Sequence, residues 1–72
     1  MHKRTKIIAT IGPASKSLEV IYKLYQNGMN VVRVNMSHAS VQDLIDISQI
    51  VSKLNKKIKS SIGLMIDTQG PE

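Results

Sequence analysis

Cysteine, tryptophan and phenylalanine are absent from this chain, and it has only two tyrosines. The absence of cysteine excludes disulfides and thiolate metal sites. Tyr22 and Tyr25 have helical spacing, unlike the aromatic platforms on which strands stack bases. Long apolar runs are missing too, because the run Ile7–Ile11 stops at Gly12 and is too short for a signal peptide or a membrane span. We therefore expect a cytoplasmic protein with no membrane partner.

The chain is also short and basic. Its 72 residues form one small domain at most, and a chain of this size buries only about 60% of its unfolded surface, so a complete enzyme is not expected. The net charge of +5 raises the question of a nucleic-acid partner. Most cationic residues, however, lie in two clusters that we interpret as a solvated terminus and a solvated loop: Lys3, Arg4, Lys6, Lys53, Lys56, Lys57 and Lys59. We expect no nucleic-acid binding and keep a small basic nucleic-acid binder as the least favoured alternative.

The first half of the sequence predicts a strand followed by a helix. Residues 6–11 form the strand, which the turn at residues 12–13 ends. Ser15 or Ser17 caps the helix, and Gly28 stops it. Apolar or aromatic residues recur in this helix at i, i+3, i+4 and i+7: Leu18, Ile21, Tyr22 and Tyr25.

The second half repeats this order. Residues 31–36 predict a second strand, and Ser40 with Asp43 forms a variant of the capping box at the start of a second helix. A wide apolar stripe marks this helix: Val41, Leu44, Ile45, Ile47, Ile50, Val51 and Leu54. A linker over residues 55–61 then leads to a third strand at residues 62–66.

The resulting order is strand, helix, strand, helix, strand. Strands that begin about 25 to 30 residues apart and are joined by helices pair in parallel, so the fold class is α/β with a βαβαβ unit. We favour the opening three strands and two helices of a (β/α)8 TIM barrel, occupying residues 1–72 as part of a barrel domain. Half of a doubly wound sheet is the alternative, but Gly12 stands alone where that fold has a Gly-x-Gly-x-x-Gly turn.

The second predicted strand has a polar side. Arg33, Asn35 and Ser37 lie at i, i+2 and i+4 and therefore share one side of an extended chain. The apolar side consists of Val32, Val34 and Met36. Because polar groups are costly to bury without partners, this pattern predicts something polar against the first side. An ordinary half-exposed strand with a solvated face is the alternative.

Polar groups also gather where the strands end. The carboxyl ends of neighbouring parallel strands lie side by side, and chemistry in such folds is found there. The guanidinium of Arg33 suits phosphate or carboxylate. Near it we expect four oxygen donors that suit a hard cation: Asn35, Ser37, Asp67 and Thr68. Only one of these donors is a carboxylate, which indicates a monovalent cation.

Each of these residues also has a structural interpretation. Arg33 and Asp67 can form an ion pair that serves stability alone, and Ser37 and Thr68 can act as caps. His38 can make a local hydrogen bond at the start of a helix. No acid or base partner is evident for His38, so we do not expect it to be a catalytic base.

Three segments occur in an order and at a spacing that point to one family. They are residues 4–15 (RTKIIATIGPAS), 27–38 (NGMNVVRVNMSH) and 67–72 (DTQGPE). Together they resemble the amino-terminal part of pyruvate kinase. The resemblance covers all of this chain but only the beginning of a family member. It implies a (β/α)8 barrel with a lid domain inserted after the third strand.

The resemblance also implies residue roles. Arg33 matches the arginine that binds the phosphoryl group of phosphoenolpyruvate. The nucleotide, ADP or ATP, is implied at Asn35, Met36, Ser37 and His38. Potassium (K+) is implied at Asn35, Ser37, Asp67 and Thr68. The chain departs from the usual family residues at Met36, Ala39 and Gln69, none of which is a matched potassium ligand.

The rest of the active site is implied to lie beyond Glu72. It includes the catalytic lysine, a second arginine and the acidic ligands of magnesium (Mg2+), so this chain holds no catalytic residue. The implied reaction is glycolytic transfer of a phosphoryl group from phosphoenolpyruvate to ADP by a longer, homotetrameric protein, and the chain alone is expected to be inactive. A non-catalytic remnant or interaction module is the alternative.

Overall fold

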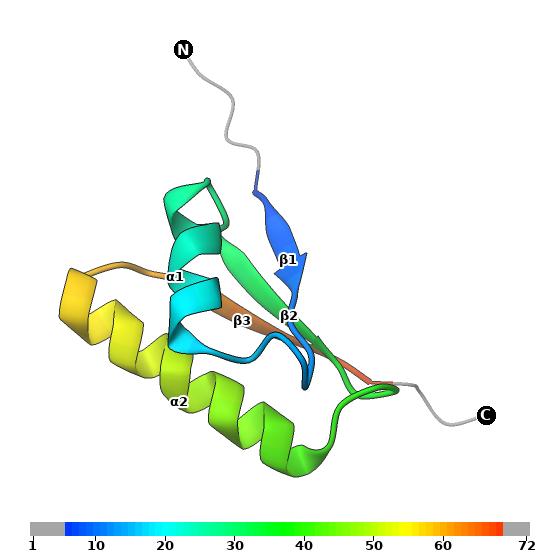
Figure 1. Ribbon diagram of the computed structural model, residues 1–72. Coiled ribbons are helices and arrows are strands. Elements are labelled where there is room, and N and C mark those ends of the chain that lie inside the picture. The colour runs from blue at the N-terminus through cyan, green and yellow to red at the C-terminus, as the bar shows by residue number, and fades with distance from the viewer. Residues whose placement is uncertain (1–5, 69–72) are drawn as a thin grey trace.

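The computed structural model describes residues 6–68, in which strands and helices alternate (Figure 1). In chain order the elements are β1 (Ile8–Thr10), α1 (Leu18–Gln26), β2 (Val31–Asn35), α2 (Val41–Ile58) and β3 (Gly63–Asp67). The predicted α/β class and element order are confirmed, although β1 is shorter than the strand predicted at residues 6–11. Within residues 6–68 we find no helix long and apolar enough to cross a membrane.

The three strands form one parallel sheet in the order β1-β2-β3. Thr10 on β1 is in register with Arg33 on β2, and Asn35 on β2 is in register with Asp67 on β3. The N–H of Met36 continues the second ladder by donating to the carbonyl of Asp67 at 2.9 Å. The carboxyl ends of all three strands therefore lie at the same end of the sheet, as predicted.

Both helices cover the same face of the sheet (Figure 1). The core between helices and sheet is made of buried apolar residues: Ile11, Ile21, Met29, Val32, Val34, Ile47, Val51, Leu54 and Ile62. Val32 and Val34 have no solvent exposure, whereas Arg33 is half-buried on the opposite side of β2. Within the strand, this alternation confirms that Arg33 and Asn35 lie on the side opposite Val32 and Val34, which is the sheet face away from the helices.

Local hydrogen bonds define both ends of α1. Of the two serines expected as N-cap, Ser17 has this role, because its hydroxyl accepts from the N–H of Val20 at 3.1 Å. At the other end, Gly28 has a φ of +106°, and the N–H of Met29 donates to the carbonyl of Leu24 at 3.0 Å. This is a Schellman motif, which a residue with a Cβ adopts only with strain. The helix stop thus delivers Met29 into the core directly before β2.

The start of α2 has the predicted capping box. The Ser40 hydroxyl accepts from the N–H of Asp43 at 3.1 Å, and the Asp43 carboxylate accepts from the N–H of Ser40 at 2.8 Å. Two N–H groups that a helix start leaves unpaired are thereby satisfied. The box fixes where the helix begins, immediately after the turn that follows β2.

The end of α2 differs from the prediction. The helix continues to Ile58, through residues predicted as a linker, so three of the four clustered lysines lie on a helix and not in a loop: Lys53, Lys56 and Lys57. Lysine is a good helix former, and Lys56 and Lys57 lie in the last turn, where the helix dipole favours cations. Lys59 ends the helix in the left-handed region, with a φ of +54°. The position of these lysines in the sequence is therefore consistent with the end of a helix.

Asn55 ties the end of α2 to the loop before β3. Its side-chain nitrogen donates to the carbonyl of Ile62 at 3.0 Å. Its Oδ1 accepts from the N–H of Ile62 at 2.8 Å and from the hydroxyl of Ser60 at 2.7 Å. One side chain thus pairs both backbone groups of Ile62 and the hydroxyl of Ser60. The strand β3 begins and ends one residue later than predicted, at Gly63 and Asp67.

Only part of the apolar stripe of α2 is buried. Val41 and Ile45 belong to this stripe but are 66% and 42% exposed. The sheet and α1 cover a face of α2 centred on Ile47, Val51 and Leu54, and the seven apolar residues occupy a wider arc than that. Other exposed apolar residues lie on or beside the outer strands: Ile7, Ile8, Leu64, Met65 and Ile66.

We expect the capping box to stabilise α2 even in an isolated peptide of residues 38–60. The hydrogen bond from the Ser40 N–H is the main cause of the lowered pKa of Asp43, and the peptide retains it, whereas the second cause, Lys16, lies outside the peptide. A lowered carboxyl pKa contributes stability above the ordinary pKa, and this stability is lost as the pH falls through the folded-state value. Helix content measured by circular dichroism should therefore fall on acidification from about pH 6 to about pH 2.

Two variant peptides serve as comparisons. Ser40→Ala should be less helical at every pH, since losing an N-cap costs about 1 kcal/mol. Asp43→Asn should respond less to acid than the original peptide. An unchanged acid response in Asp43→Asn would show that the capping box does not control this helix.

The isolated 72-residue chain should not fold cooperatively. Apolar side chains on both outer strands are exposed, the described sheet has open edges, and no disulfide strengthens so small a core. We expect an unfolded, molten or self-associated chain in calorimetry and sedimentation. A monomer with a single two-state heat-capacity peak would contradict this expectation.

Candidate functional site

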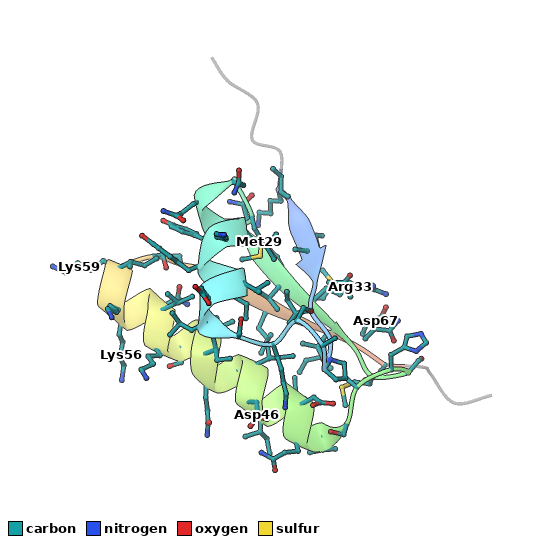
Figure 2. The ribbon with its side chains drawn as sticks, in the orientation of Figure 1. Met29, Arg33, Asp46, Lys56, Lys59 and Asp67 are labelled. Atoms are coloured by element: carbon teal, nitrogen blue, oxygen red, sulfur yellow. The ribbon has the colours of Figure 1, made fainter. Side chains whose placement is uncertain are left out.

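Arg33 is the middle residue of β2, the central strand, and its side chain lies between residues of both neighbouring strands. Its Nη2 donates to Oδ2 of Asp67 on β3 in an ion pair, and its Nη1 donates to Oγ1 of Thr10 on β1 at 3.1 Å. Figure 2 shows Arg33 and Asp67 on the side of the sheet away from the helices. The side chain of Arg33 is 31% exposed. The guanidinium is thus held from two sides and still reaches solvent.

The ion pair is the structural alternative that the sequence left open, and it is present. Because its two side chains are 31% and 43% exposed, it contributes only about 0–1 kcal/mol to stability. It also leaves binding capacity on both groups. The guanidinium has five N–H donors, of which these two bonds use two, and within residues 6–68 only one carboxylate oxygen of Asp67 is engaged. The pair therefore orients Arg33 without blocking a ligand.

The chain turns sharply after β2. Oδ1 of Asn35 accepts from the N–H of Ser37 at 2.9 Å, and the carbonyl of Asn35 accepts from the N–H of His38 at 3.0 Å. This Asx-turn ends the strand at Asn35, so the expectation that Ser37 shares a strand face with Arg33 is wrong. Ser37 and His38 are exposed, while Met36 is partly buried against the core.

The four predicted cation ligands lie at the ends of two neighbouring strands. Asn35 and Asp67 are direct partners in the β2–β3 register, Ser37 follows β2 by two residues, and Thr68 follows β3 directly. All four retain solvent exposure. The oxygens that these residues offer, with Thr68 contributing its carbonyl or its hydroxyl, are of the kind that a hard cation prefers. No cluster of three or more His, Cys, Asp or Glu residues suited to a metal occurs in residues 6–68.

Thr10 is the residue of this site that the sequence does not single out. It is the last residue of β1, and its hydroxyl is one of the two anchors of the Arg33 guanidinium. The available signal in the sequence is weak, because Thr10 is simply one polar residue in an otherwise apolar run. Its neighbour on the next strand depends on the β1–β2 register. That register places Thr10 level with Arg33.

A second charged cluster joins the β1–α1 loop to α2. Nζ of Lys16 lies 2.9 Å from Oδ1 of Asp43 and 2.5 Å from Oδ2 of Asp46. Hydrogen bonds to Asp46 and then to Asp43 raise the pKa of Lys16. The Lys16 ammonium is the main cause of the lowered pKa of Asp46, whereas the Ser40 N–H is the main cause for Asp43. All three groups therefore stay charged near neutral pH, and the cluster fixes the loop to the first turns of α2.

Comparisons with known proteins agree with one another. The family profile described as "Pyruvate kinase, barrel domain" matches residues 2–72. Pyruvate kinase of Thermoplasma acidophilum is 45% identical over 69 residues, and that of Staphylococcus epidermidis is 46% identical over 70. These alignments cover 96% and 97% of this chain but only 12% of each relative.

A solved structure extends the likeness to three dimensions. The crystal structure of a pyruvate kinase from Cryptosporidium parvum matches with a TM-score of 0.83 at 38% sequence identity. The match covers 94% of this chain and 14% of that chain. In sequence and in structure, the chain spans a small fraction of the length of the proteins that it resembles.

Proposed function

Because this chain belongs to the pyruvate kinase family, whose barrel-domain profile matches its residues 2–72, we propose that it works as the amino-terminal segment of a pyruvate kinase barrel. Residues 1–72 then supply the first three strands and two helices of the barrel domain. The reaction is the glycolytic transfer of a phosphoryl group from phosphoenolpyruvate to ADP, which gives pyruvate and ATP. In this proposal the working protein is cytoplasmic and homotetrameric.

The observation that carries the proposal is the anchored guanidinium of Arg33. It comes from the middle of a parallel strand and is held by Thr10 and Asp67, the last residues of the neighbouring strands. Barrel enzymes bind substrates at this end of the strands, and the remaining N–H donors match the oxygens of a phosphoryl group. Phosphoryl transfer depends on positioning and on positive charge that neutralises the charge of the transition state. Arg33 supplies one such charge, and the rest must come from other parts of the longer protein. The segment alone is therefore inactive.

We assign nucleotide binding to the turn after β2, at Asn35, Met36, Ser37 and His38. Support comes from the position of this turn beside Arg33 and from the exposure of Ser37 and His38. The Asx-turn holds the backbone in place, and the packing of Met36 against the core holds the same turn on the side of the helices. A fixed, solvent-facing turn of this kind suits a ligand that must lie next to the phosphoryl group.

We assign a potassium ion to the oxygen donors described above: Asn35, Ser37, Asp67 and Thr68. When bound, the cation adds positive charge beside the phosphoryl site. Asp67 provides the only formal negative charge of the set and also holds Arg33, so the same carboxylate orients one cationic group and helps to hold another. Magnesium ligands belong to the part of the protein that follows Glu72 in this proposal.

A chimera tests the function. This chain would replace the 70 matching residues of the Staphylococcus epidermidis enzyme, and we expect the product to form pyruvate from phosphoenolpyruvate and ADP. In the chimera, Arg33→Lys keeps the charge but loses the planar fork, so kcat should fall by about 10²–10³-fold.

Lys56→Gln is the matched control, because it removes an exposed cation at the far end of α2 and should leave kcat unchanged (Figure 2). An inactive chimera would favour the non-catalytic remnant or interaction module. Full turnover in Arg33→Lys would rule out the role assigned to this residue.

Potassium dependence tests the cation site in the same chimera. Asp67→Asn removes the only formal charge among the ligands. The potassium concentration that gives half-maximal activation should therefore rise by about tenfold or more. Ser37→Ala removes one neutral donor and should have a smaller effect. Choline chloride would hold the ionic strength constant. A chimera that is equally active with potassium, with sodium and with neither would exclude a functional site here.

A further inference from the structure

Thr10 forms the second anchor of the Arg33 guanidinium. From this contact we propose that Thr10 is a positioning residue: it fixes the orientation of Arg33 for phosphoryl transfer, a role that rests on the function proposed above. The geometry is direct, since Nη1 of Arg33 donates to Oγ1 of Thr10 at 3.1 Å, and the two residues are partners in the β1–β2 register.

Two anchors on different nitrogens restrict the guanidinium more than one does. With Asp67 alone on Nη2, the planar group remains free to rotate about that contact. With Thr10 on Nη1 as well, both terminal nitrogens are held, one from β3 and one from β1. The plane of the fork is then set by the sheet, and the free N–H donors point in a fixed direction. Such preorganisation matters because the donors must face the place where charge develops.

The two anchors also differ in their electrostatic effect. The Asp67 carboxylate holds Arg33 but offsets part of its positive charge at the place where an anion must bind. The Thr10 hydroxyl is neutral and holds the same group without this loss. Because this hydroxyl accepts from Arg33, its own hydrogen is free to donate elsewhere. A hydroxyl is thus better suited than a second carboxylate to complete the anchor.

A simpler role for Thr10 has to be separated from this one. Threonine is β-branched and favours strands, so it could serve β1 only through its shape. The two roles predict opposite effects of two variants on turnover. Thr10→Val keeps the branched shape and loses the hydroxyl, whereas Thr10→Ser keeps the hydroxyl and loses the methyl group.

The experiment uses the chimera with the Staphylococcus epidermidis enzyme. For a positioning role, Thr10→Val should lower kcat by about tenfold with an unchanged melting temperature, and Thr10→Ser should stay within about twofold of the parent. In an Arg33→Lys background, Thr10→Val should have almost no further effect, because the group that it positions is gone.

Several results would overturn the inference. Parent-like turnover in Thr10→Val together with impaired Thr10→Ser would show a packing role. A full tenfold loss from Thr10→Val in the Arg33→Lys background would show that Thr10 acts without Arg33.

The same measurements separate a failure of the proposed function from a failure of the role of Thr10. If Arg33→Lys keeps full turnover, or if the chimera is inactive, the function assigned to Arg33 is wrong and the role of Thr10 falls with it. If Arg33→Lys is impaired while Thr10→Val is not, only the positioning role is wrong.

Discussion

Burial of Val32 and Val34 under the two helices is the constraint on which the rest of the structure depends. Side chains alternate along a strand, so enclosing these two valines turns Arg33 and Asn35 to the opposite face of the sheet. A slip of one residue would expose the valines and bury the guanidinium, which the core does not allow. The location of the candidate site therefore follows from the packing of apolar residues that never touch a ligand.

The parts of the fold that the sequence predicted are those that local forces determine. Short apolar runs predicted the first and third strands, alternation predicted the second, and a period of 3.6 predicted the two helices. The Ser40–Asp43 capping box could be recognised because its partners lie three residues apart. The end of α2 was predicted too early because a run of charged lysines resembles a solvated linker, although lysine also has a high helix propensity. Ser37 was misplaced because the side chain of Asn35 competes with the strand for the backbone N–H.

The candidate site was predictable in part for the same reason. Arg33 and Asp67 could be brought together from strand order alone, since adjacent parallel strands end at the same side. Thr10 required the register of β1 against β2, which apolar alternation in a short strand does not determine. The contacts of Lys16 with α2 required the path of a loop, and no periodic pattern describes a loop. The sequence therefore does not predict polar contacts that depend on the register of a short strand or on the path of a loop.

The double use of Asp43 bears on how freely this sequence can vary. Its carboxylate accepts from the N–H and the hydroxyl of Ser40 and also binds Lys16, so three bonds depend on one side chain. Asp46, one turn further along, accepts from Lys16 and Gln42. Replacement of Asp43 therefore loosens a helix start and a distant loop in a single mutational step. At Asp43, tolerance to substitution therefore depends on the number of separate segments that the residue joins, which its burial does not reveal.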